Sequence, residues 1–249
     1  MASGIPQKID DLIYQRLNEY NKNSSVIPEL QLQDLVKKAK TLNQIEQYTC
    51  LAALYSHAFK HKKTKENAIK AIAYCNGEKS YIINASAALI NINLCRELVE
   101  ISKTNSILLE YTESRQDVYD AALYALDLEY CDMITEKYGL PDIPRANHKD
   151  LLDFFDHDND LLEKGGKYID FALENLIKVL KVNSVRTSSL QLDLVNSDDD
   201  SFLGLTVNFK NLSIDKVIDM EDQWYSHLAK FSVSDDKLCN MSFTMRDDS

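Results

Sequence analysis

The sequence predicts a mainly helical protein that ends in a small ββαβ unit, and three observations carry this prediction. Over most of residues 1–182, apolar side chains recur every three or four positions, which is the period of an amphipathic helix. The period changes to two at Ser189, as it does in a half-buried strand. The 249 residues include only six Gly and four Pro, which leaves few breaks for long irregular loops.

Two short amphipathic helices are expected first. Pro6 precedes one and Pro28 precedes the other, and the polar turn at 21–25 separates them. Their apolar stripes consist of Ile9, Leu12, Ile13 and Leu17, and of Leu32, Leu35, Val36 and Ala39. We expect the two to pair as a helical hairpin.

Four longer helical stretches follow, and we expect one helix in each. They are residues 41–59, 64–75, 80–102 and 114–138. Asn76-Gly77 ends the second of them, because Gly takes the left-handed conformation that closes helices. The third stretch has the longest apolar face in the chain.

The clearest internal joint is expected at 139–147. Leu140-Pro141 and Ile143-Pro144 favour extended backbone there, since a residue before Pro avoids the helical region. Beyond the joint a helix opens at Leu151, Gly165-Gly166 interrupts it, and a last helix continues to Leu180. This gives about eight to nine helices in residues 1–182.

The helical part has the composition of a repeat array. Pairs of small residues lie along the apolar stripes, and small side chains let helices approach closely. The similarity to tetratricopeptide arrays is one of composition, because 48–77 lacks both the glycine expected in the first helix of that pattern and the proline expected at the end of the repeat. Two architectures therefore stay open, a helical-repeat-like array of antiparallel helices and an irregular bundle.

Residues 183–249 are predicted to form a separate ββαβ unit. Alternating apolar residues predict strands at 190–194 and 203–209, a helix with Trp224 in its stripe follows Ser213, and a third strand runs from Cys239 to Met245. Three strands and one helix make a marginal domain. We therefore expect this unit to pack on the preceding helices or on a partner, a second copy of the chain included.

The chain is acidic, with a net charge of −11, and the acidity is concentrated at its end. Residues 183–249 hold twelve acidic and six basic side chains, a net −6. This charge disfavours binding to nucleic-acid phosphates and favours a basic protein partner. We expect the acidic loop residues Asp198, Asp199 and Asp200 to contact such a partner if they are not simply solvated.

Cysteine usage and hydropathy predict a cytoplasmic protein. The five cysteines are widely spaced, form no CxxC pair and are expected to be buried free thiols in a reducing compartment. The first residues do not form a signal peptide, and no run approaches the ~20 apolar residues that span a bilayer. We expect no membrane association.

The densest set of candidate metal ligands lies at 153–163. Asp156, His157 and Asp160 stand out. Asp156, Asp158 and Asp160 repeat the first half of a calcium loop, but Leu161 replaces its glycine and Lys167 its closing glutamate. If the segment is helical, Asp153, His157 and Asp160 share one face, but a single helix does not complete a site. The competing interpretation is a solvated acidic face.

Two further clusters suggest chemistry only weakly. His57 and His61 have the spacing of a zinc helix, but Ala58 replaces the glutamate that would act as general base. The lysines of the Lys60–Lys65 segment suit RNA or phosphate, but they equally suit the end of a helix. Phosphate-binding glycine loops and G-x-S-x-G motifs are absent from the sequence, and we expect no cofactor.

Three functions are compatible with these observations. The first is a non-enzymatic interaction or regulatory protein, such as an acidic inhibitor, an immunity protein or a complex subunit. The second is a metal-dependent hydrolase centred on Asp153–Glu163, and the third is a nucleic-acid-associated factor that uses Lys60–Lys65. Because the chain carries no recognisable catalytic motif, the first is favoured.

Overall fold

The computed structural model describes residues 8–139, 148–196, 201–233 and 235–247. It confirms a mainly helical protein with a small C-terminal α+β unit. The helices that precede the sheet are α1 (Ile9–Asn21), α2 (Glu29–Ala39), α3 (Gln44–His57), α4 (His61–Tyr74), α5 (Lys79–Ile90), α6 (Cys95–Thr104), the 3-10 turn η1 (Ser106–Leu109), α7 (Thr112–Tyr124), α8 (Leu128–Tyr138), α9 (His148–Phe154) and α10 (Asn159–Asn183). The predicted joint at 139–147 lies almost entirely outside the described residues.

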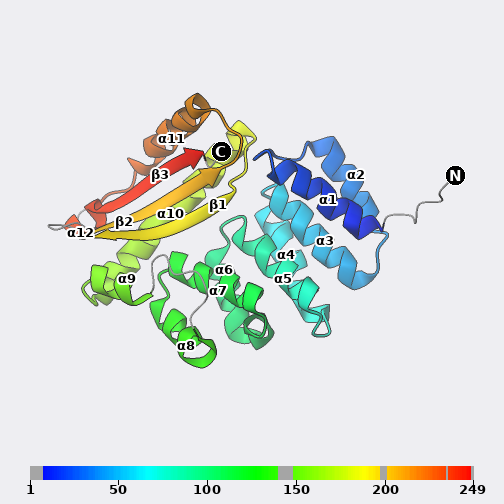
Figure 1. Ribbon diagram of the computed structural model, residues 1–249, viewed down its shortest axis with the longest axis horizontal. Coiled ribbons are helices and arrows are strands. Elements are labelled where there is room, and N and C mark those ends of the chain that lie inside the picture. Colours follow the sequence, from blue (N-terminus) through cyan, green and yellow to red (C-terminus); the bar gives the residue numbers. More distant parts are fainter. Residues whose placement is uncertain (1–7, 140–147, 197–200, 234, 248–249) are drawn as a thin grey trace.

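Three helix pairs repeat along the array. Their first helices, α3, α5 and α7, start at Gln44, Lys79 and Thr112, which are 35 and 33 residues apart. Helix α3 packs on α5 and α5 packs on α7, while α4 and α6 each contact the first helices of two pairs (Figure 1). This stacking buries one continuous apolar layer, as helical repeats do.

The turn inside each pair contains a residue with positive φ that is not glycine. These residues are Phe59, Asn93 and Leu126, with φ of 52°, 59° and 52°. The left-handed conformation costs roughly 1–2 kcal/mol for Phe59 and Leu126, but both side chains are buried in the core. Burial of a large apolar side chain contributes about 1.5–3 kcal/mol and offsets that cost.

These turns correct the predicted number of helices. The stretches 80–102 and 114–138 each hold two helices, with breaks at 91–94 and 125–127. The described residues before the sheet therefore contain ten α-helices, more than the eight to nine expected.

The break predicted at Gly165-Gly166 is absent from helix α10. The helix runs unbroken through Gly165 and Gly166, which are both buried, so the prediction that this pair interrupts the helix is wrong. The chain instead turns between α9 and α10, where Asp156 and His157 have φ of 52° and 56°. The Asp158 carboxylate then caps α10 by accepting from the backbone N–H groups of Asp160 and Leu161.

The ββαβ order of the C-terminal unit is present. Strands β1 (Ser189–Asn196), β2 (Ser201–Phe209) and β3 (Met241–Asp247) form one sheet in the order β1-β2-β3, with β1 antiparallel and β3 parallel to β2. Helix α11 (Ile214–Leu228) connects β2 to β3. The third strand begins at Met241 because Cys239 ends a short helix, α12 (Asp236–Cys239), capped by the Asp235 side chain.

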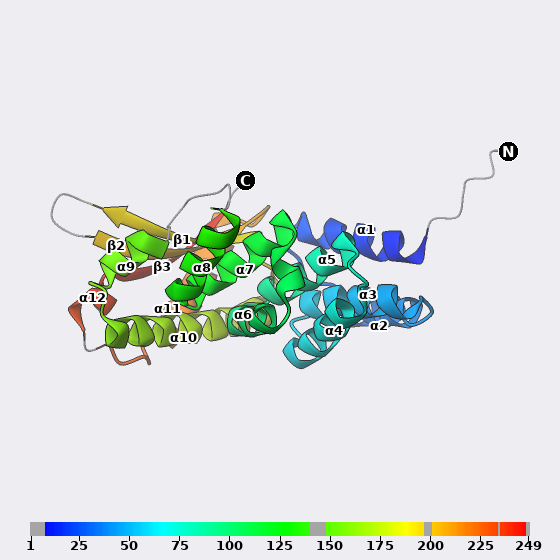
Figure 2. The ribbon, with the colours of Figure 1, turned by 90° about the horizontal axis from the view of Figure 1, so that it is seen from below.

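The sheet packs on the helices of the same chain. Trp224 of α11 is fully buried, and its Nε1 donates to the carbonyl oxygen of Ala172 in α10 at 2.9 Å. One apolar cluster includes side chains from α3–α10, the three strands and α11, while α1, α2 and part of α3 form a second cluster. Figure 2 shows α10 running below the sheet and meeting α6.

Four of the five cysteines are buried. Cys50, Cys75, Cys95 and Cys131 are buried free thiols, whereas Cys239 is exposed, contrary to expectation, because it lies at the surface end of α12. Among the described residues, no helix has both the length and the apolar character needed to cross a bilayer.

Candidate functional site

Two open hollows flank α10 on the side that faces the helix pairs. One, of about 710 Å³, lies between α10 and α6 with the start of α4. The other, of about 690 Å³, lies between α10 and the α7–α8 turn. Both are lined by Arg96 and Asp170. Because they meet at these two residues, we treat them as one site and name it the α10 groove.

Arg96 and Asp170 form an ion pair between the two hollows. Arg96 Nε donates to Asp170 Oδ2 at 2.5 Å. Burial raises the pKa of Asp170, and the bond from Arg96 opposes this rise. A Cβ at Gly166 would lie 3.2 Å from Arg96 Nη2, so the absence of a side chain at Gly166 leaves room for the guanidinium against α10.

The α10 groove is strongly acidic. Its lining includes eight carboxylates, Glu97, Glu100, Asp127, Glu129, Asp132, Glu163, Asp170 and Glu174, and three cationic side chains, Lys65, Arg96 and Lys167. Glu129 and Glu174 are exposed, and neither forms an ion pair with any residue that the structure describes. The groove therefore presents a net negative field to an approaching partner.

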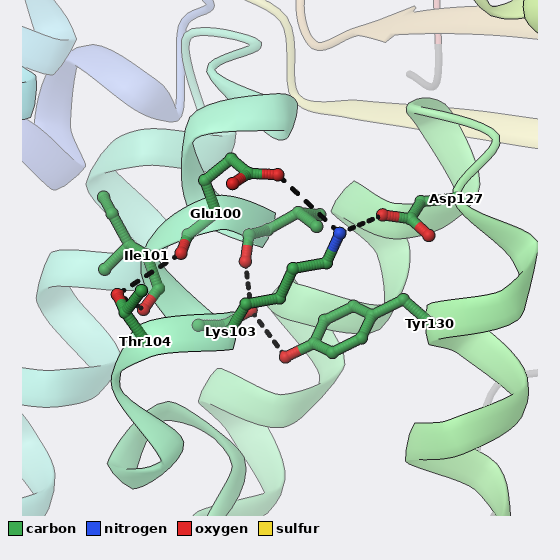
Figure 3. A network of polar contacts seen from close by, with 8 residues as sticks. Glu100, Ile101, Lys103, Thr104, Asp127 and Tyr130 are labelled. Carbon is green, nitrogen blue, oxygen red and sulfur yellow. Dashed lines mark hydrogen bonds and ion pairs between the residues drawn. The ribbon is translucent and has the colours of Figure 1, made fainter.

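A polar network joins α6 to α8 at the edge of the groove (Figure 3). Lys103 Nζ lies 2.7 Å from Asp127 Oδ2 and 3.7 Å from Glu100 Oε1, and it lies over the ring of Tyr130. The hydrogen bond to Asp127 raises the pKa of Lys103. The Tyr130 hydroxyl lies 2.9 Å from Ser102 Oγ. These contacts hold the second helices of two neighbouring pairs in a fixed relation.

The two histidines that suggested a zinc helix lie on different helices. His57 ends α3 and His61 begins α4, with the Phe59 turn between them. His61 lines the groove, its Nε2 is buried without a hydrogen-bond partner, and burial, with the nearby Lys181, lowers its pKa. His57 instead lines a separate small cavity.

The predicted metal ligands Asp156, His157 and Asp160 lie at the α9–α10 turn. All three are exposed. Asp156 Oδ2 is 3.3 Å from Lys237 Nζ, and His157 Nε2 is 3.1 Å from Asp153 Oδ1. The helical face assumed in the metal interpretation does not form, because Asp156 and His157 are in left-handed conformations. Within the described ranges, no three His, Cys, Asp or Glu side chains are arranged to hold a metal ion.

The other two predicted clusters have different outcomes. Lys60 pairs with Glu29 at 3.1 Å, and Lys65 lies 3.7 Å from Glu97, so two of these lysines are engaged by carboxylates of the chain itself. Asp198, Asp199 and Asp200 lie outside the described residues.

Sequence reasoning missed the residues that define the groove. Arg96 and Asp170 are 74 positions apart, and neither belongs to a motif. An exposed Glu129 or Glu174 is indistinguishable in sequence from any solvated helix surface. Gly166 was the one groove residue that stood out in the sequence, and its role depends on the Arg96 side chain from another helix.

The chain matches no protein-family model, no curated protein and no solved structure in the three comparisons made. The chain is therefore classified by its fold and its groove. It is an array of helix pairs with a C-terminal three-stranded α+β unit and an acidic groove along α10.

Proposed function

We propose that this protein is a non-enzymatic interaction protein that binds a basic segment of a protein partner in the α10 groove. An inhibitor, an immunity protein or a regulatory subunit of a complex would act by such binding to its partner, without catalysis. The observation that carries the proposal is the excess of eight carboxylates over three cationic side chains in the lining of the two hollows, with Lys103 at the edge as a fourth cation. Complementary charge speeds association and selects partners by sign.

The dimensions of the groove suit a peptide segment. The residues of α10 that line it run from Asn159 to Ile177, about 27 Å at 1.5 Å per residue. An extended segment of about eight residues covers that length. Leu173 and Ile177 supply an apolar floor between the charges, so a segment with alternating basic and apolar residues fits best.

The test is binding of a labelled peptide of about 12 residues with alternating Lys and Leu, measured by fluorescence polarisation against a Glu-Leu peptide of the same length. We expect saturable binding of the basic peptide that weakens as salt is added, because salt screens exposed charges. The double variant Glu129→Lys, Glu174→Lys should weaken binding about tenfold or more, which corresponds to about 1.4 kcal/mol.

The matched control is Asp219→Lys with Asp222→Lys. Both residues are exposed on α11, outside the groove, and the net charge changes by the same amount. The control should bind the basic peptide as the unmodified chain does. An equal loss in both double variants would mean general charge attraction and would overturn the assignment of the groove.

A further inference from the structure

A second, smaller cavity lies where α1, α3 and α5 meet the segment that follows α10. It has a volume of about 120 Å³, and His57, Asn84 and Arg186 are among the residues that line it. Within the described part of the chain, no Asp or Glu lines it. This distinguishes it from the α10 groove, because its one ionised lining residue is a cation.

Arg186 is buried without a carboxylate partner. Its side chain is only 6% exposed. Nη1 donates to the carbonyl oxygen of Ser56 at 2.9 Å, and Nη2 donates to that of Asn91 at 3.3 Å. These carbonyls lie at the C-terminal ends of α3 and α5, where the helix dipoles offset part of the positive charge. Nε is buried and has no acceptor.

His57 adds a second donor without an acceptor. It is 3% exposed, and its Nδ1 accepts from the backbone N–H of Ile27 at 3.4 Å. In a neutral imidazole, the other nitrogen then carries the proton, so Nε2 is a donor. Burial and the Arg186 charge lower the pKa of His57 to about 2, which keeps the ring neutral. Nε2 is buried and has no hydrogen-bond partner.

The described residues that line the cavity therefore carry one cation, no carboxylate and two donors without acceptors. Buried donors are paired in the great majority of native proteins, so two unpaired donors in residues that line one cavity call for an acceptor. Asn18 and Asn84 also line the cavity, and each amide can donate a hydrogen bond to a ligand there. Water is a neutral acceptor, whereas an anion also compensates the charge of the buried guanidinium, which the two carbonyl oxygens and the Phe59 ring, 5.0 Å from the guanidinium, offset only in part.

We propose that this cavity binds a small oxyanion of the phosphate, sulfate or carboxylate class, with Arg186 and His57 as its principal donors. The guanidinium group is suited to such anions because its N–H groups match two oxygens at once. A volume of about 120 Å³ is that of about four water molecules, which accommodates one phosphate-sized group and no nucleoside. The proposal does not depend on the function proposed for the α10 groove.

The test is thermal unfolding of the whole chain with increasing inorganic phosphate, sulfate or acetate at constant ionic strength. A ligand that binds only the folded state raises Tm in a saturable way. Because phosphate and sulfate also stabilise proteins by exclusion from their surface, the decisive comparison is with Asn84→Asp. This variant places a carboxylate in the cavity as an internal counter-ion.

We expect the Tm of the unmodified chain to rise and level off with phosphate. Asn84→Asp should start from a higher Tm and show no saturable rise. The control is Asn43→Asp, an exposed helix cap whose side chain accepts equally well from Glu46 N–H after the change, and it should respond as the unmodified chain does.

A direct signal keeps the proposal falsifiable if Asn84→Asp does not fold. The side-chain Nε–H of Arg186 in the unmodified chain should shift in the NMR spectrum as phosphate is added, and the shift should saturate. An unmoved Arg186 signal would overturn the proposal. An equal Tm rise in Asn84→Asp and in the unmodified chain would do so as well.

Discussion

Gly165 lies directly against the ring of Phe155: a Cβ at Gly165 would be 2.8 Å from both Cε1 and Cζ of that ring. The same Cβ would be 3.2 Å from Leu126 Cδ1. Phe155 is fully buried at the end of α9, and Leu126 is the left-handed residue of the α7–α8 turn. Gly165 therefore lets α10 approach two other parts of the array.

Gly165→Ala should destabilise the protein by about 1–3 kcal/mol through overpacking against Phe155. The better helix propensity of Ala, worth up to about 1 kcal/mol, offsets only part of this loss. Urea unfolding followed by circular dichroism measures the difference. Gly166→Ala is the comparison, because the nearest atom there is the flexible end of Arg96, and it should stay within about 1 kcal/mol of the unmodified chain. Equal effects at the two positions would contradict the close approach.

Asp117 should give the protein an unusual pH dependence. Ser86 Oγ donates to its carboxylate at 2.6 Å, but burial raises the pKa of Asp117 to about 7. Between about pH 4 and pH 7 the folded state keeps a proton that the unfolded state has released. This group therefore lowers the free energy of unfolding as the pH rises through that window, and its effect levels off above it.

Asp117→Asn isolates this effect, since Asn still accepts from Ser86 but does not ionise. The variant should be more stable than the unmodified chain above about pH 7, and the advantage should shrink towards about pH 4. His57 has the opposite effect, because its unfolded form takes up a proton below about pH 6.5 while the folded ring stays neutral. Because His57 contributes equally in both proteins, the measurement is the free energy of unfolding of Asp117→Asn minus that of the unmodified chain at each pH. A constant difference across the window would exclude a raised pKa for Asp117.

Trp224 is the only tryptophan in the chain, and it reports on how the C-terminal unit is attached. Because it is fully buried and bonded to Ala172, and because one apolar cluster spans both parts, we expect tryptophan fluorescence and helical circular dichroism to change together in urea. Separate transitions would mean that residues 183–249 unfold as a domain of their own.

Removal of metal ions should leave the protein unchanged. Asp156 pairs with Lys237 and His157 pairs with Asp153, and no group of three ligands exists in the described ranges. We therefore expect EDTA to leave Tm unchanged and expect no stoichiometric metal in the purified chain. Bound metal that disappears in Asp156→Ala would restore the hydrolase hypothesis.

Much of the fold was predictable because helical and strand periods are local properties. The first two helices, the change of period at Ser189 and the ββαβ order all follow from the spacing of nearby apolar residues. The breaks at Asn93 and Leu126 were not predictable in this way. Leu126 adopts the left-handed conformation because its burial in the packed core offsets the cost, and Asn93 tolerates that conformation because of its short polar side chain.

The candidate sites were even less predictable. No local pattern brings Arg96 to Asp170, and Arg186 lies 130 positions from the carbonyl group to which it donates. The metal cluster at 153–163, by contrast, was conspicuous in sequence because its residues are neighbours, yet the left-handed residues Asp156 and His157 prevent the single helical face that would have aligned its ligands.

The sequence by itself determined the helical class, the acidic charge and the place where helices give way to strands, because each depends on composition or on spacing within one element. Only the tertiary structure decided that α10 runs on through Gly165 and Gly166, that β3 lies parallel to β2, and that a buried Arg186 faces a cavity without carboxylates. Those features depend on which elements pack together, and the free energy of that packing belongs to residues far apart in the chain.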